Sequence, residues 1–288
     1  MDIIPEGLPG RKSPFPILYP ASMVKSGSMS GQGDIRGAVI YSAIAVATYF
    51  FIQSVFVILH EHIHSTTAYL LGHMSSPFAI VWGNPLTLSG WDEGVSYSAL
   101  FSAGLGPDAA IIAVMPLIFH AIVVTGGIWV LLSPLLAKRK WWFHLVFWLV
   151  VMNLMELIAY MPMRAFETHE DIGNINHGLG LSPWVLFFPG TLLILLWLYL
   201  LFCRVLPRAS VVIAGDSQPV RYALLILSAF FVFDWRSIFR VVLLPFPETE
   251  WVIGFAGILS CVIVILLCRP GLSWVTSAEE RAREEIVC

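Results

Sequence analysis

The sequence predicts an all-α polytopic membrane protein, with about six transmembrane helices and a short irregular or β-like segment between the first two. Apolar residues make up 58% of the 288 residues and charged residues only 12%, and the mean hydropathy is positive. The apolar residues gather in runs about as long as the roughly 20 residues that cross a bilayer. This composition excludes an ordinary soluble domain, and we expect the lipid bilayer rather than nucleic acid as a partner.

The apolar runs predict spans near residues 37–60, 104–134, 141–161, 184–206, 221–244 and 251–268. Residues 1–36 are predicted to be a flexible leader, residues 37–270 one membrane-embedded domain, and residues 271–288 a tail. Six spans place both termini and the loops 135–140 and 207–220 on one face. Of the 16 basic residues, only Arg164, Arg236 and Arg240 fall on the other face, so the positive-inside bias predicts cytoplasmic termini.

The first predicted span ends in His60-Glu61-His62-Ile63-His64, which contains the pattern His-Glu-x-x-His. Histidines four residues apart lie one turn apart on a helix face, so His60 and His64 can bind a single zinc ion. Glu61 would lie beside the ion as a general base, taking a proton from a metal-activated water. The alternative is a polar helix end at the membrane surface. Ionisable side chains at membrane depth cost roughly 2 to 4 kcal/mol each, which favours a functional site.

The next segment, residues 75–102, is too short and too polar to cross a membrane. Its Trp82-Gly-Asn-Pro85 and Ser89-Gly-Trp91-Asp-Glu-Gly94 stretches predict turns between short extended pieces. Irregular backbone at membrane depth survives only where it is buried in protein or faces water. The segment could therefore line the mouth of a site and pair with an unwound substrate. A surface loop with interfacial tryptophans is an equally good interpretation.

A third ligand is expected in the polar loop of residues 162–183, because this loop and the histidines emerge on the same face. We predict Asp171, since an Asp-x-Gly placement lets a short carboxylate project from a tight turn. His169 is the runner-up, followed by Glu167, Glu170 and His177. An ordinary charged loop outside the membrane is the alternative.

The predicted span before this loop carries Asn153, Glu156 and Tyr160 at spacings of three and four, so these residues share one helix face. Such a face is expected to meet protein or water rather than lipid. For Glu156 two roles stay open: a buried neutral carboxyl group, or a group that supports the site or contacts substrate.

Three pieces of the sequence resemble the site-2 protease family of intramembrane zinc metalloproteases. They are His60-Glu61-x-x-His64 with the following Ser65-Thr-Thr-Ala-Tyr-Leu-Leu-Gly72, the segment Ala103-Gly-Leu-Gly106-Pro107, and Asp171 with Gly173. The resemblance covers about residues 45–180. It implies one zinc ion held by His60, His64 and Asp171, with Glu61 as general base. It also implies hydrolysis of a peptide bond in or near a transmembrane segment of a membrane-protein substrate.

Two other functions remain open at this point. An inactive protease-like scaffold would keep the fold and bind membrane partners. A di-iron membrane oxidoreductase would need histidine clusters, whereas the remaining histidines stand singly, at His73, His120, His144, His169 and His177. The four cysteines show no disulfide framework and are expected to be packing residues or free thiols. The oligomeric state is not indicated by the sequence.

Overall fold

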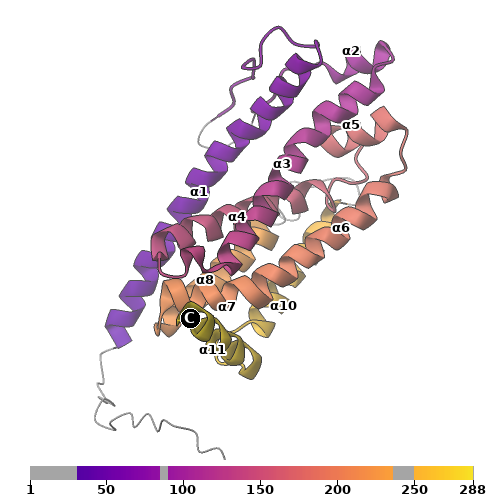
Figure 1. Ribbon diagram of the computed structural model, residues 1–288. Helices are drawn as coiled ribbons and strands as arrows, with labels where there is room; N and C mark the ends of the chain where they lie inside the picture. Colours follow the sequence, from indigo (N-terminus) through magenta and orange to yellow (C-terminus); the bar gives the residue numbers. More distant parts are fainter. Residues whose placement is uncertain (1–30, 85–89, 236–249, 288) are drawn as a thin grey trace, which may run out of the picture.

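The computed structural model describes residues 31–84, 90–235 and 250–287, and the regular secondary structure in these residues is helical. The long helix α1 (Gly31–Leu70) runs along one side of the bundle, and α11 (Ser273–Val287) lies across its lower end (Figure 1). Four helices are long and apolar enough to cross a membrane: Ile35–Leu70, Gly106–Leu132, Lys140–Tyr160 and Pro183–Ala214.

The other helices follow in chain order as α2 (Tyr97–Ser102), α3 (Gly106–Leu132), α4 (Lys140–Tyr160), α5 (Glu170–Leu179), α6 (Pro183–Leu200), α7 (Leu206–Ala209), α8 (Gln218–Ala229) and α10 (Glu250–Leu267). A 3₁₀ turn, Pro134–Leu136, follows α3. The π-helical turns Leu201–Val205 and Ser210–Ala214 make α6 and α7 parts of one long helix. A further π-helical turn, Phe230–Asp234, extends α8.

Four helices that are long and apolar enough to cross a membrane coincide with the first four predicted spans. The fifth predicted span, residues 221–244, is helical up to Trp235, and its remainder lies outside the described residues. The sixth coincides with α10, whose apolar part Val252–Leu267 is shorter than the four crossing helices. Helix α1 begins at Gly31, earlier than the predicted start at residue 37, and residues 1–30 of the predicted leader lie outside the described part of the chain.

The segment between α1 and α3 does not confirm the predicted β-like character, since its described residues form no strand. One antiparallel bridge joins Val81 to Asp92, with N to O distances of 2.7 and 3.2 Å. The segment is tied to α1 by the Ser65 hydroxyl, which lies 2.9 Å from Ala79 O and 3.1 Å from Glu93 O. These contacts hold the residues around Glu93 against the helix that carries the histidines.

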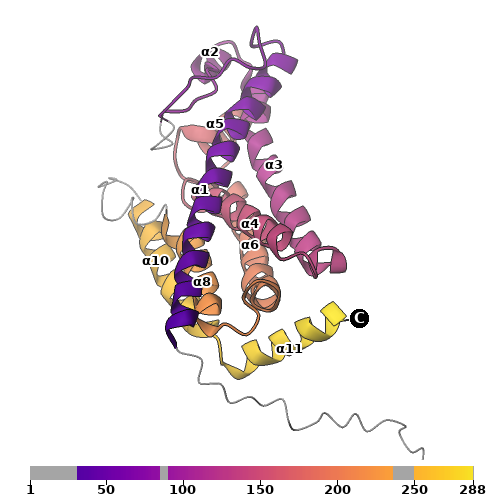
Figure 2. The same ribbon diagram turned by 90° about the vertical axis from the view of Figure 1, so that its left-hand side faces the viewer.

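Helix α4 lies at the centre of the bundle. In its apolar window 78% of the residues are buried, compared with 22% for α1. Figure 2 shows α4 behind α1, with α3 on one side and α8 and α10 on the other. Because both faces of α4 meet protein, its polar residues Asn153 and Glu156 are buried within the bundle.

Helix α5 lies on the first turns of α3 because both helices present glycine at the crossing (Figure 1). A Cβ added at Gly178 would lie 2.3 Å from Gly106 O, and one added at Gly106 would lie 2.7 Å from Gly178 O. Small residues allow two backbones to approach this closely. The contact brings the start of α5, which carries Asp171, toward the histidines of α1.

Candidate metal centre

Three side chains from two helices that are far apart in the sequence, α1 and α5, meet at one point. His60 and His64 of α1 are 6% and 1% exposed, and Asp171 in the first turn of α5 is 7% exposed. His64 Nε2 lies 3.2 Å from His60 Nε2. Asp171 Oδ2 lies 3.2 Å from His60 Nε2, and Asp171 Oδ1 lies 3.2 Å from His64 Nε2. The structure thus brings together the three predicted ligands.

The protonation of His64 follows from its backbone contact. Its Nδ1 lies 2.9 Å from the carbonyl oxygen of Ile112 in α3, which can only accept a hydrogen bond. Nδ1 of His64 therefore carries a proton and donates it, which leaves the Nε2 lone pair facing His60 and Asp171.

The protonation of His60 is fixed through a relay into α4. Asn153 Nδ2 donates to Leu149 O at 2.7 Å, so Asn153 Oδ1 faces His120 Nδ1 at 2.6 Å and accepts from it. His120 Nε2 is then an acceptor for His60 Nδ1 at 3.1 Å. In this arrangement His60 also donates through Nδ1 and presents an Nε2 lone pair to the centre. Outer hydrogen bonds of this kind orient the histidines of metal sites.

Two lone pairs and a carboxylate that face one another at 3.2 Å require a positive charge between them. A proton can bridge only one pair, whereas a metal ion can bind to all three groups. Tetrahedral zinc with ligand bonds of about 2.0 to 2.1 Å needs ligand atoms about 3.3 Å apart, close to the observed spacing. Asp171 Oδ2 has no hydrogen-bond partner although it is buried. The donor set therefore fits a divalent cation.

The charge of Asp171 agrees with this arrangement. Burial by itself would raise the pKa of its carboxyl group. When the facing imidazoles carry an extra proton in place of a metal ion, their positive charge outweighs burial and holds the pKa of Asp171 below its usual range. A bound cation would act on this carboxyl group in the same direction. The carboxylate is consequently negative at any physiological pH and available as a ligand.

Two more carboxylates flank the centre. Glu61 and Glu93 each offer an oxygen within 4.8 Å of the other and of a His64 ring nitrogen. Glu93 comes from the irregular segment after α1 and is 7% exposed, and burial raises its pKa to about 7. Glu61 is thus close enough to act beside a bound ion, with Glu93 as its neighbour.

A polar cavity of about 420 Å³ opens onto the centre. Its walls include Glu61, Glu93, Glu156 and Tyr160, together with Asp171. The Tyr160 ring stacks on His60 with centroids 5.3 Å apart, and its hydroxyl lies 3.4 Å from His60 Nε2. The face predicted from Asn153, Glu156 and Tyr160 therefore meets protein and this cavity. The cavity is large and polar enough to hold water.

The loop that carries Asp171 differs from the prediction in one respect. Asp171 does not project from a tight turn but lies in the first turn of α5. The preceding Glu170 has a φ of 62°, a left-handed conformation that is uncommon outside glycine, and an ion pair of 2.9 Å with Arg164 holds it. Helix α5 forms because the Gly178 contact and buried Ile172 and Ile175 pack it on α3 and its neighbours.

The other candidate ligands of this loop do not join the cluster of His60, His64 and Asp171. Glu167, His169 and Glu170 form a partly exposed group of their own, separate from the two histidines of α1. His177 stacks on Phe101, with ring centroids 4.2 Å apart. Among the described residues, Asp171 is therefore the loop residue that meets both His60 and His64.

Sequence reasoning missed two residues of the site, His120 and Glu93. His120 stands within an otherwise apolar span, and the cost of a polar group there was a usable signal. Glu93 belongs to a segment that was expected to line the site, yet its own role could not be read from its neighbours. Both reach the centre only because α3 and the 90–97 segment pack against α1.

Compared with protein-family models, curated proteins and solved structures, the chain gives no match. The described residues establish a buried cluster of His60, His64 and Asp171 that could hold a metal ion. They also place this cluster in a bundle with four helices suited to crossing a membrane.

Proposed function

We propose that the chain is an intramembrane zinc metallopeptidase, which hydrolyses a peptide bond in or near a transmembrane segment of a membrane-protein substrate. The observation that carries this proposal is the set of three buried acceptors 3.2 Å apart, with Glu61 alongside. Two of the three, His60 and His64, are oriented by hydrogen bonds through Nδ1. The resemblance of the His60 to Gly72 stretch to site-2 proteases favours the same function.

The position of the site on a helix suited to crossing a membrane supports an intramembrane reaction. Helix α1 has 40 residues, which at about 1.5 Å per residue makes it longer than the roughly 30 Å hydrocarbon core. His60 and His64 fall within the crossing helix Ile35–Leu70 rather than beyond it. A polar cavity at this level would supply the water that hydrolysis needs in an otherwise apolar bundle.

The residues of the site suit peptide hydrolysis. A zinc ion bound by His60, His64 and Asp171 would polarise a carbonyl and lower the pKa of water. Glu61 would take a proton from the attacking water as its oxygen bonds to the carbonyl carbon, and would pass it to the nitrogen as the C–N bond breaks. Tyr160, with its hydroxyl 3.4 Å from His60 Nε2, is placed to donate to the oxygen that becomes negative.

The surroundings of the cavity support the proposed substrate class. Gly90 to Tyr97 form part of its wall, so a peptide entering from the membrane would pass this irregular segment. A helical substrate hides its carbonyl groups in hydrogen bonds and must unwind before attack. The exposed backbone near the Val81 to Asp92 bridge could hold such an unwound piece as an added strand.

A single ion fits better than a di-iron centre. The second group, Glu61 and Glu93 with His64, shares its only histidine with the first. His64 Nδ1 is engaged by Ile112 O, so its imidazole can serve one ion through Nε2. Since two histidines and one carboxylate also suit a single Fe(II) ion, the bound metal has to be measured.

The test is metal analysis and cleavage by the purified full-length chain. We expect one zinc per chain, lost in His64→Ala and Asp171→Ala but kept in His169→Ala. Glu61→Gln should keep the zinc and lose cleavage of synthetic transmembrane peptides followed by mass spectrometry. In H₂¹⁸O, one ¹⁸O should enter each new carboxyl group.

Other results would exclude the proposal in distinct ways. Iron in place of zinc would indicate an oxidation catalyst. Zinc without peptide cleavage would favour the inactive scaffold, and cleavage that persists in Glu61→Gln would remove this residue from the mechanism.

A further inference from the structure

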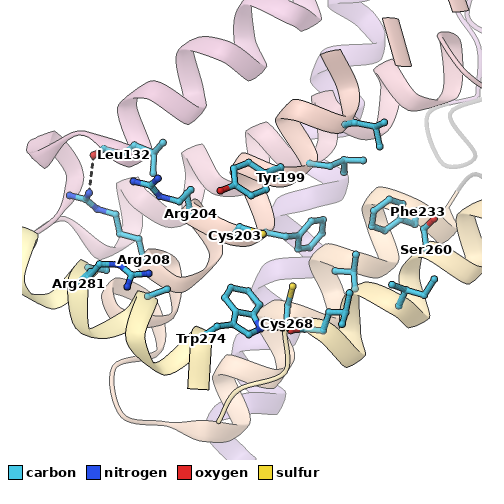
Figure 3. Close-up of a pocket in the computed structure, with 18 of the residues that line it drawn as sticks. Leu132, Tyr199, Cys203, Arg204, Arg208, Phe233, Ser260, Cys268, Trp274 and Arg281 are labelled. Atoms are coloured by element: carbon cyan, nitrogen blue, oxygen red, sulfur yellow. Dashed lines mark hydrogen bonds between the residues drawn. The ribbon is translucent and has the colours of Figure 1, made fainter. Parts of the chain in front are cut away.

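A second cavity, of about 1160 Å³, lies between α6, α10 and α11. It shares no lining residue with the cavity of the metal centre. Figure 3 shows that its labelled arginines gather at one end, whereas Phe233 and Ser260 lie at the other. The cavity therefore has an apolar end and a basic end.

The apolar end is a cleft between two helices with exposed apolar side chains. Leu195 and Leu198 of α6 form one wall, and Ile263 and Val264 of α10 form the other. Both helices carry exposed apolar side chains next to the cleft, including Leu196 at 52% and Leu266 at 59%. The space between α6 and α10 is an apolar channel that opens on the outer surface of the bundle.

The basic end holds two arginines that lack a carboxylate partner in the described part of the chain, Arg204 and Arg281. Arg208 lies between them and is buried, donating to Leu132 O at 2.8 Å and to Ser133 O at 3.0 Å. The one acidic lining residue, Glu285, is paired with Arg208 at 3.0 Å. The end of the cavity thus carries positive charge without local compensation.

The basic end also lies at the depth of a membrane surface. The helix that begins at Pro183 reaches Arg204 after about 30 Å at 1.5 Å per residue, the thickness of the hydrocarbon core. On the facing side, α10 ends at Leu267, and Trp274 follows at the base of the cavity. Tryptophan and arginine are typical of the interface between lipid tails and head groups.

We propose that this cavity binds an anionic glycerophospholipid. One acyl chain would lie between α6 and α10, and the phosphate would bind Arg204 and Arg281. The shape and charge of the cavity support this occupant, because basic pockets between transmembrane helices recognise acidic head groups. The inference is independent of the metal centre and of peptide hydrolysis.

Native mass spectrometry of the full-length chain in detergent tests the proposal. The probes are phosphatidylglycerol and phosphatidylcholine with identical acyl chains, each titrated against the protein. We expect wild-type protein to prefer phosphatidylglycerol by about 25-fold, and Arg204→Gln or Arg281→Gln each to weaken its binding about 5-fold. Ser260→Trp should fill the apolar end and weaken binding without changing the basic end.

Arg283→Gln is the matched control. Arg283 lies on α11 like Arg281, but it pairs with Asp216 at 2.9 Å and does not line the cavity. It should bind lipid like the wild type. Gel filtration and thermal unfolding show whether each variant is folded, and Ser260→Trp and the two arginine variants test opposite ends, so one misfolded variant does not decide the result.

Three outcomes would overturn the proposal. Equal affinity for the two lipids would show that the arginines do not select an acidic head group. Unchanged lipid binding in Ser260→Trp would remove the acyl chain from the cleft. Full displacement of lipid by inorganic phosphate alone would indicate a site for free anions.

Discussion

The bundle has an aromatic region and a polar region, and α1 and α4 pass through both. In the aromatic region, Tyr49 of α1 stacks on Phe231 with centroids 3.7 Å apart, and Trp148 of α4 meets both rings edge-on. In the polar region, about three turns further along α1 and between one and two turns further along α4, the two helices are linked from His60 through His120 of α3 to Asn153. The two regions differ in what one lost side chain does.

In lipid the hydrophobic effect does not drive helices together, so the aromatic region depends on close packing. Loss of one aromatic side chain there removes many small packing contacts at once. In the polar region each group has one main partner, and a lost partner leaves a buried donor or acceptor unsatisfied. We therefore expect the aromatic region to govern folding and the polar region to govern metal binding.

The largest effect is expected from Asp171→Ala. Zinc sites have binding free energies of about 10 to 16 kcal/mol, so each ligand contributes about 3 to 4 kcal/mol. Loss of Asp171 should therefore lower the zinc affinity several hundred-fold. Competition with a zinc chelator measures it. Asp108→Ala is the control, since Asp108 does not belong to the metal centre. Its Oδ2 pairs with His73 Nε2 at a distance of 2.7 Å. Equal losses in both variants would mean that general unfolding, not ligation, releases the metal.

Phe231→Ala tests the aromatic region. Removing a buried phenylalanine costs about 3 to 5 kcal/mol of unfolding free energy, and we expect the low end of this range. Unfolding in mixed micelles measures the stability, and the chelator assay on the folded fraction should show unchanged metal affinity. A parallel fall in metal affinity would show that the two regions act as one unit.

Gly178→Ala tests how α5 positions Asp171. Its Cβ would lie 2.3 Å from Gly106 O, so α5 must move away from α3. Overpacking of this kind costs about 2 kcal/mol, and we expect metal affinity to fall about 30-fold. Gly126→Ala on α3 is the control. A Cβ added at Gly126 has no atom within 4 Å, so this variant should keep the metal affinity unchanged. If Gly178→Ala binds metal normally, the glycine crossing does not set the position of Asp171.

Asn153→Ala tests the relay behind His60. Without the acceptor at 2.6 Å, His120 is free to change tautomer and no longer orients His60. Loss of such an outer partner lowers metal affinity about 10-fold. Asn153→Asp keeps an acceptor oxygen and should restore most of the affinity. No recovery in Asn153→Asp would point to packing rather than proton placement.

The smallest effect is a pH dependence from Glu93. Burial raises the pKa of this carboxyl group to about 7 in the folded chain, above its unfolded value of 4.5. The folded state therefore holds the proton more tightly, and stability should fall as the pH rises from about 5 to 7. Because the cavity admits water, we expect a loss of about 1 kcal/mol in chelator-treated protein. Glu93→Gln should make this slope shallower; an unchanged slope would assign it to another group.

The sequence by itself determined the membrane class and the positions of the four long helices, because the length and apolar content of a run are local properties. It also determined the histidine pair of α1, since the spacing of four residues places both on one helix face. Asp171 was predicted from its polar loop, although its place at the start of α5 was not.

Only the tertiary structure decided how the centre is completed. The contact of His60 with His120 joins residues 60 positions apart in the chain, and the His120 to Asn153 contact joins residues 33 apart. Glu93 reaches the site through a segment without regular structure. No local pattern specifies such contacts, because they depend on how α1, α3, α4 and α5 pack together and on the glycine crossing that lets α5 approach.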